Sequence, residues 1–128
     1  MEFIISDTKE GEGAAIEAGH PQVKKELYAI WDLHKQKNRD YSEAGHKEGG
    51  DVFSNFRACE KFNVDTLSGI LVRMSDKWER CCNLHAKQGR NSVPGESLKD
   101  AFRDLIGYSA IYLAELDDQE KEKMVIKN

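Results

Sequence analysis

The sequence predicts an all-α protein, folded as a bundle of about four main helices. Only two of its 128 residues are proline, the residue that most strongly disrupts a helix. Few runs are rich in β-branched residues, so strands are disfavoured. Apolar residues instead recur at helical spacing. A content of 39% apolar and 33% charged residues is typical of one globular domain.

The composition divides the chain into three parts. Residues 1–20 are mainly polar and contain glycines, which predicts a flexible N-terminal arm. Residues 21–117 carry the helical pattern and are expected to form the domain. Residues 118–128 are highly charged, so we expect a C-terminal tail that frays.

A first helix is expected over about residues 21–38. Pro21 suits a helix start, because its missing N–H would have no partner there. The following residues 39–51 contain three glycines and are expected to form a loop. The residues expected on the inner side of this helix are Val23, Leu27, Ile30, Trp31 and His34.

A short second helix and a long third helix follow. Asp51 and Asp65 precede them as candidate N-caps, since a carboxylate accepts hydrogen bonds from free N–H groups of a first turn. Residues 88–95 contain Gly, Asn and Pro and end the pattern. The expected inner residues are Val52, Phe53, Phe56 and Cys59 in the second helix and Leu67, Ile70, Leu71, Met74, Trp78, Cys81 and Leu84 in the third.

A fourth helix is expected over about residues 96–117, and it is apolar on two sides. Gly107, Ala110, Ile111 and Ala114 lie opposite its main stripe. A helix that is apolar on two sides usually packs between neighbours, so we expect this helix at the centre. Its main stripe comprises Leu98, Phe102, Leu105, Ile106, Ser109, Leu113 and Leu116.

Charge and cysteine content exclude several classes of protein. The net charge is −4 and no basic block occurs, which disfavours a nucleic-acid binder. No stretch approaches the roughly 20 apolar residues of a membrane helix. The three cysteines include two adjacent ones, a poor disulfide framework, and the N-terminus lacks the basic start of a signal peptide. We therefore expect a cytoplasmic protein with reduced thiols.

Acidic residues gather on the second side of the fourth helix. Asp100 and Asp104 are four residues apart and share a face, with Glu96 one turn earlier. The third helix carries Asp76 and Glu79, three residues apart. Acid pairs from two neighbouring helices can hold a metal inside a bundle. All-oxygen ligands suit Mg²⁺ or Mn²⁺, which clamp phosphates and activate water for phosphoanhydride cleavage.

Each acid also has a structural interpretation. Asp76 and Glu79 lie away from the apolar stripe and could be ordinary solvated acids. Asp100 could form a capping box with Ser97 at the start of the fourth helix. Asp104 is the hardest to explain in this way, because its neighbours on the helix are large and partly apolar.

Residues 37–41, Lys-Asn-Arg-Asp-Tyr, also allow two interpretations. They could form a helix C-terminus, where cations interact favourably with the helix dipole. They could instead contact a base and sugar, with Tyr41 stacking and Asn38 or Asp40 forming hydrogen bonds. Cys81 and His85 are expected in the core, since the further ligands of a zinc site are missing from the sequence.

Short blocks of the sequence resemble two families. The segment Glu96-Ser-Leu-Lys-Asp100, followed by an apolar helix, is similar to the acidic helix of MazG-like, all-α NTP pyrophosphohydrolases. Residues 35–116 more closely resemble the phage and bacterial nucleotide modification associated domain. The matching blocks are KNRDY at 37–41, DVFSNF at 51–56, MSDKWER at 74–80 and ESLKD at 96–100, together with Asp104 and Tyr108.

This resemblance implies a MazG-like, nucleotide-handling domain that cleaves a (deoxy)nucleoside triphosphate to the monophosphate and pyrophosphate with Mg²⁺ or Mn²⁺. It also implies a homodimer or homotetramer in the cytoplasm, including the host cytoplasm for a phage-encoded protein. The implied metal ligands are Asp76, Glu79, Glu96, Asp100 and Asp104, of which all but Glu96 are also the implied catalytic acids. The implied substrate-binding residues are Lys37, Asn38, Asp40, Tyr41, Asn55, Phe56 and Tyr108, with Lys77 and Arg80 at the phosphates.

The chain departs from the family pattern at two positions. Asp76 stands where the first Glu of a Glu-x-x-Glu pair is expected, and Ser97 replaces the second acid of the fourth-helix motif. One metal ligand is therefore missing from the pattern. This favours an alternative, a nucleotide-binding or sequestering protein without catalysis. A third interpretation is a helical interaction module that binds no nucleotide.

Overall fold

The computed structural model describes residues 18–42, 45, 50–87 and 97–127. These ranges contain helices and no strand, which confirms the predicted all-α class. None of the helices in them combines the length and apolarity needed to cross a membrane. The elements are α1 (Pro21–Tyr41), α2 (Ser54–Arg57), the 3-10 helix η2 (Ala58–Phe62), α3 (Thr66–Ala86) and α4 (Leu98–Lys127).

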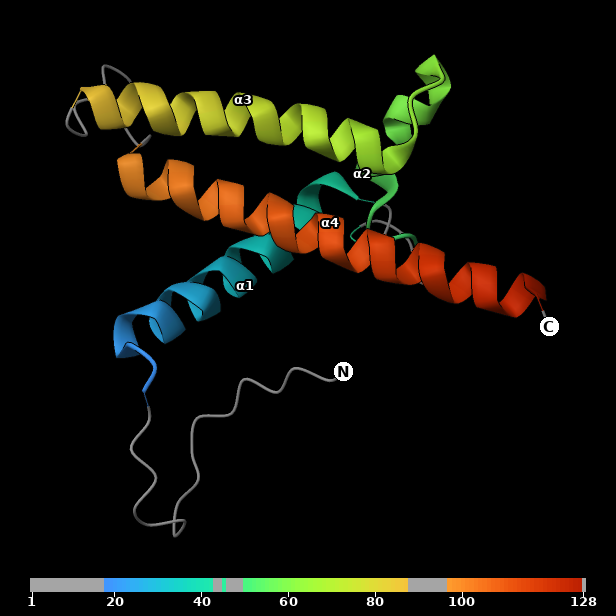
Figure 1. The fold of residues 1–128 in the computed structure, drawn as a ribbon, viewed down its shortest axis with the longest axis horizontal. Helices are drawn as coiled ribbons and strands as arrows, with labels where there is room; N and C mark the ends of the chain where they lie inside the picture. The colour runs from blue at the N-terminus through green and yellow to red at the C-terminus, as the bar shows by residue number, and fades with distance from the viewer. Residues whose placement is uncertain (1–17, 43–44, 46–49, 88–96, 128) are drawn as a thin grey trace, which may run out of the picture.

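Helix α4 lies at the centre, as its two apolar sides predict. It packs against α3 along one side and against α1 along another (Figure 1). The chain runs in opposite directions along α3 and α4, while α1 crosses the middle of α4 obliquely. Two groups of buried residues hold this arrangement together, Phe53, Phe56, Ile70 and Ile111 in one and Cys81, Leu84 and Ala101 in the other.

The helix starts follow local chemistry. Pro21 is in the first turn of α1, and the His20 side chain accepts a hydrogen bond from the Gln22 backbone N–H. Asp65 caps α3 as predicted, accepting from the Ser68 N–H at 3.0 Å. These interactions satisfy N–H groups that have no partner inside a helix.

Two helices run further than the sequence pattern suggests. Helix α1 continues to Tyr41 rather than ending near residue 38. Helix α4 continues to Lys127 rather than ending near residue 117. The reason is local, because residues 117–127 contain neither Gly nor Pro and Lys121 pairs with Asp117 one turn away. The N-terminal arm up to residue 17 and residues 88–96 lie outside the described ranges.

The predicted inner stripes are wider than the surface that the fold covers. Trp31 and Trp78 remain 57% and 54% exposed, and Leu113 is 65% exposed. His85, expected in the core, is exposed as well. Each outer helix meets neighbours over only part of its circumference, so the edges of an apolar stripe stay at the surface. The other stripe residues that are exposed are Val23, Leu27, Val52, Leu71, Phe102 and Ile106.

Gly69 and Gly107 are two mid-helix glycines in contrasting surroundings. A Cβ added at Gly69 would collide with the Cys59 Sγ, whereas one at Gly107 would lie 3.8 Å from the Ile30 Cγ2, an ordinary contact. Both changes to alanine gain about 0.5–1 kcal/mol of helix propensity. Only Gly69→Ala must also displace a neighbour, which costs about 1–3 kcal/mol. In urea denaturation, Gly107→Ala should therefore unfold with a larger free energy than the wild type. The free energy of unfolding of Gly69→Ala should be about 2 kcal/mol below that of Gly107→Ala.

The Cys59→Ala change provides the control, because it removes the colliding sulfur. Gly69→Ala made in the Cys59→Ala background should recover the helix-propensity gain seen at Gly107. Equal stabilities of Gly69→Ala and Gly107→Ala in the wild-type background would contradict the close approach of η2 to α3.

Candidate functional site

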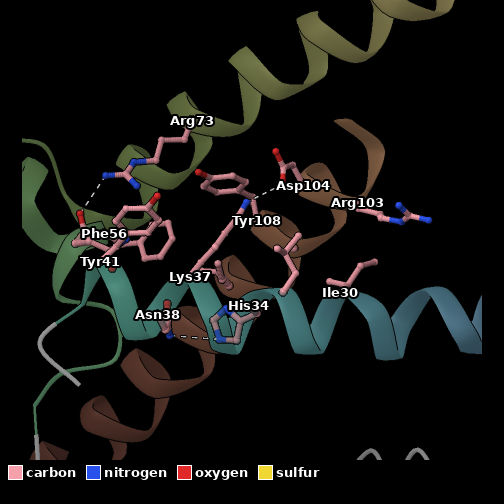
Figure 2. Close-up of a pocket in the computed structure, with 14 residues that line it drawn as sticks. Ile30, His34, Lys37, Asn38, Tyr41, Phe56, Arg73, Arg103, Asp104 and Tyr108 are labelled. Carbon is pink, nitrogen blue, oxygen red and sulfur yellow. Dashed lines mark hydrogen bonds and ion pairs between the residues drawn. The ribbon is translucent and has the colours of Figure 1, made fainter. Parts of the chain in front are cut away.

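A pocket of about 460 Å³ lies between α1, α2, α3 and α4. Figure 2 shows side chains from these elements converging on it. The pocket is open to solvent and combines apolar, aromatic, amide and cationic groups. Its lining residues are Ile30, Leu33, His34, Lys37, Asn38, Tyr41, Asn55, Phe56, Arg73, Arg103, Asp104, Gly107, Tyr108 and Ile111.

Three aromatic rings form part of the wall. Phe56 is buried, and its ring meets that of Tyr108 edge-on at 5.9 Å between centroids. Tyr41, at the end of α1, is 67% exposed and lines the same pocket. An exposed ring that shares a pocket with a buried, fixed one can cover a planar ligand at low entropic cost.

Polar groups without charge lie on the same side of the pocket. His34 and Asn38 are one turn apart on α1, with 3.5 Å between the imidazole Nε2 and the amide Nδ2. Burial lowers the pKa of His34, so the ring is mainly neutral at pH 7 and can both donate and accept hydrogen bonds. The Asn55 Oδ1 is buried and has no hydrogen-bond partner among the described residues. An unsatisfied buried acceptor of this kind is uncommon in a folded protein.

Arg73 reaches the pocket from α3. Its guanidinium lies 4.8 Å from the centre of the Phe56 ring and donates a 3.0 Å hydrogen bond to the Asn55 backbone oxygen. Arg103 also lines the pocket, but its guanidinium is held by Glu26 at 2.7 Å and by Asp100 at 3.2 Å. The two arginines therefore differ in their partners, since Arg73 donates to a backbone oxygen, whereas Arg103 pairs with two carboxylates and ties α1 to α4.

Asp104 lies at the centre of a cluster of cations. Its carboxylate accepts from Lys37 at 2.9 Å, and Lys77 and Arg80 lie 3.6 and 3.8 Å away. Figure 2 shows Lys37 extending from α1 toward Asp104, with the Tyr108 ring beside the pair. These four groups by themselves sum to a formal charge of +2, which favours anions.

Among the described residues, the other predicted metal ligands do not form a group of three or more acids with Asp104. Asp100 forms the capping box, because its backbone N–H donates to the Ser97 Oγ at 3.0 Å and its carboxylate accepts from the Ser97 N–H. These hydrogen bonds lower the pKa of Asp100. Asp76 and Glu79 are exposed on α3, which agrees with their interpretation as ordinary solvated acids. Glu96 lies outside the described residues.

The described residues do not fit a metal ion. In residues 18–42, 45, 50–87 and 97–127, three or more His, Cys, Asp or Glu side chains nowhere come together as a metal site would require. The one partly buried acid of the pocket, Asp104, is surrounded by cations that would repel a divalent ion.

Helix α2 carries Asn55 and Phe56 into the pocket, and Arg57 fixes this short helix in place. The Arg57 guanidinium donates to Asp51 and, at 2.7 Å, to Glu115 of α4. Asp51 also accepts from the Phe53 N–H at 2.9 Å, so it orders the residues just before α2 rather than capping the helix directly. The hydrogen bond from Arg57 lowers the pKa of Asp51, and both acids raise the pKa of Arg57.

The structure brings together most of the substrate-binding residues predicted from the sequence. Lys77 and Arg80 do not line the pocket, but they lie 3.6 and 3.8 Å from the carboxylate of Asp104, which does. Asp40 is exposed and does not line the pocket. Sequence reasoning missed His34 and Arg73 as site residues. Helical spacing was a usable signal, because each lies one turn before a predicted residue, Asn38 and Lys77 respectively. The predicted residues that line the pocket are Lys37, Asn38, Tyr41, Asn55, Phe56, Asp104 and Tyr108.

Comparisons with known proteins do not assign the chain to a family. Neither a protein-family model, a curated protein nor a solved structure matches the chain. The pocket and the sequence blocks that form it are therefore the observations that bear on the class of ligand.

Proposed function

We propose that this protein binds a nucleotide in the pocket between α1, α2, α3 and α4. The observation that carries the proposal is that an aromatic and amide wall shares one pocket with Lys37 and Asp104, which also belong to a cluster with more cations than carboxylates. Aromatic rings with amide groups suit a base, and lysine with arginine suits phosphate. The sequence blocks that resemble the nucleotide modification associated domain supply many of the pocket residues, which supports the same ligand class.

The two ends of the pocket assign the parts of the ligand. Tyr41 and Phe56 would cover the base, and Asn38 and Asn55 would form hydrogen bonds with its edge or with the sugar. The cations around Asp104 would bind the phosphates, with Arg73 between the two ends. A pocket of about 460 Å³ is within the usual range of small-molecule sites.

Calorimetric titration tests the proposal. The protein should bind nucleoside triphosphates in buffer with EDTA, and the corresponding nucleosides should bind at least tenfold more weakly because they lack the phosphate contacts. The panel should contain ribo- and deoxyribonucleotides of all bases, titrated at one fixed, low salt concentration because phosphate binding is screened by ions. Absence of binding and of any thermal shift across the panel would favour a helical interaction module instead.

MazG-like pyrophosphohydrolysis is the second candidate function. One observation favours it, namely that the carboxylate of Asp104 lies beside Lys77 and Arg80, the cations assigned to the phosphates. Against it stands the poor fit of the described acids to Mg²⁺. Pyrophosphate release from the same nucleotide panel with Mg²⁺ present distinguishes the two, because a binding or sequestering protein gives no turnover.

Self-association is the last part of the proposal. Large apolar side chains remain exposed on all three long helices, among them Trp31, Trp78 and Leu113. Apolar surface of this kind supports a protein interface, and a homodimer or homotetramer would cover it. Sedimentation velocity measures the stoichiometry directly, and a monomer at all concentrations would exclude this part.

A further inference from the structure

We infer that Asp104 is a resident counter-ion for the cations that would bind a ligand phosphate, so that these cations exchange its carboxylate for the phosphate on binding, without a metal ion. This inference rests on the proposed nucleotide pocket and changes the role that the sequence resemblance gives to Asp104. Because the described acids fit a metal ion poorly, the Asp104 carboxylate needs a role other than that of a metal ligand.

The depths of the charged groups show which of them an incoming anion meets first. The Asp104 side chain is only 12% exposed, whereas those of Lys37, Lys77 and Arg80 are 45%, 28% and 26% exposed. The carboxylate therefore lies beneath the cations, and each of the two lysines has more donors than the one that it directs at Asp104. A phosphate can reach them without passing Asp104.

The origin of the cations shows what Asp104 does when no ligand is bound. Lys37 is on α1, while Lys77 and Arg80 are on α3, the two helices that pack on different sides of α4. Without a central anion these three cations would repel one another. Asp104 neutralises part of this charge and holds the lysines near the positions in which they would meet a phosphate.

The lysines have room to exchange partners. The Lys77 Nζ lies 5.8 Å from the centre of the Tyr108 ring as well as 3.6 Å from Asp104, so its position is only loosely fixed by the carboxylate. A lysine side chain rotates readily and offers three donors. A phosphate with two or three negative charges competes effectively with one carboxylate for such donors.

The decisive variant is Asp104→Asn, with inorganic pyrophosphate and ATP as probes, both in EDTA. Removing the competing negative charge should tighten metal-free binding of both probes about threefold to tenfold, the size expected for one partly exposed charge. Asp100→Asn is the matched control on the same helix, because its carboxylate caps α4 and pairs with Arg103 rather than with the cluster. Its affinity for both probes should not change.

The outcomes separate this inference from the proposed function. Unchanged or weaker metal-free binding by Asp104→Asn, in a protein whose wild type binds ATP, would overturn the counter-ion role and leave the nucleotide pocket standing. Mg²⁺-dependent pyrophosphate release by the wild type that the variant loses would also overturn it. Failure of the wild type to bind nucleotide would instead defeat the proposed function. Circular dichroism checks folding, and Asp104→Ser serves as a second variant if Asp104→Asn is unfolded.

Discussion

Replacing Lys37 with methionine is expected to weaken nucleotide binding about 10-fold to 100-fold. The change removes a charge-assisted hydrogen bond to phosphate, worth about 1.5–3 kcal/mol, and each 1.4 kcal/mol corresponds to a factor of ten in affinity. It also leaves Asp104 without its closest partner, the ammonium group at 2.9 Å, so the carboxylate repels a phosphate more strongly. Methionine preserves most of the apolar stem, which limits the effect on packing.

Lys35→Met on the same helix is the matched control. Lys35 pairs with Asp32 at 3.4 Å, lies 5.6 Å from the centre of the Trp31 ring and does not line the pocket. The Lys35→Met change removes the same net charge from the protein as Lys37→Met, so any general electrostatic effect appears in both variants. Calorimetric titration with ATP in EDTA measures the two affinities. Equal affinities would show that Lys37 does not contact the ligand.

Replacing Arg57 with alanine is expected to have the largest effect on stability, about 3 kcal/mol. Breaking a buried ion pair from one side typically costs 3–5 kcal/mol, and partial exposure of Arg57 places this variant at the lower end. Its partner Glu115 has a side chain only 4% exposed, with one carboxylate oxygen already unpaired among the described residues. Loss of Arg57 would leave most of that charge buried and uncompensated. Urea denaturation followed by circular dichroism measures the change.

A second change distinguishes a buried charge from a general loss of contacts. Adding Glu115→Gln to Arg57→Ala should recover part of the lost stability, because a neutral amide costs less to bury than an unpaired carboxylate. Lys121→Ala is the surface control, since Lys121 and Asp117 are 70% and 61% exposed and such pairs contribute little. An Arg57→Ala variant as stable as Lys121→Ala would contradict the role of Arg57 in fixing α2.

The ion pair between Arg57 and Asp51 predicts that the stability of the fold depends on pH. The hydrogen bond from Arg57 lowers the pKa of Asp51 from its ordinary value of 3.8. An acid with a lowered folded-state pKa stabilises the fold fully above its ordinary value and loses this contribution as the pH falls through the folded-state pKa. The wild type should therefore lose stability as the pH falls below about 4, the ordinary pKa range of an aspartate. This acid-dependent loss should be smaller in Arg57→Ala, where Asp51 has lost that donor.

Helix boundaries were predictable where local chemistry sets them. Pro21 and Asp65 mark the starts of α1 and α3, because proline and N-cap carboxylates act within one turn of the chain. The C-terminal end of α4 was not predictable in the same way. High charge suggested fraying, yet good helix formers and the Asp117–Lys121 pair extend the helix.

The candidate site was only partly predictable. Asn38, Asn55 and Tyr108, which the resemblance to nucleotide-handling families assigns to one site, line the same pocket although they are far apart in the chain. Helical spacing alone put Asp100 and Asp104 on one face, and both interpretations of Asp100 were open until the capping hydrogen bonds with Ser97 were seen. The grouping of acids from two helices stays a prediction, since Glu96 lies outside the described residues.

By itself the sequence determined the helical class, the central position of α4 and the capping at several helix starts. Each follows from the period and chemistry of residues within a few turns of one another. Only the tertiary structure decided which charges meet. The partners of Asp104 come from α1 and α3, 67 positions before it in the case of Lys37, and no spacing rule within one helix can predict a contact between helices. The sign of the pocket's charge, and with it the ligand class proposed, therefore depends on how three helices pack.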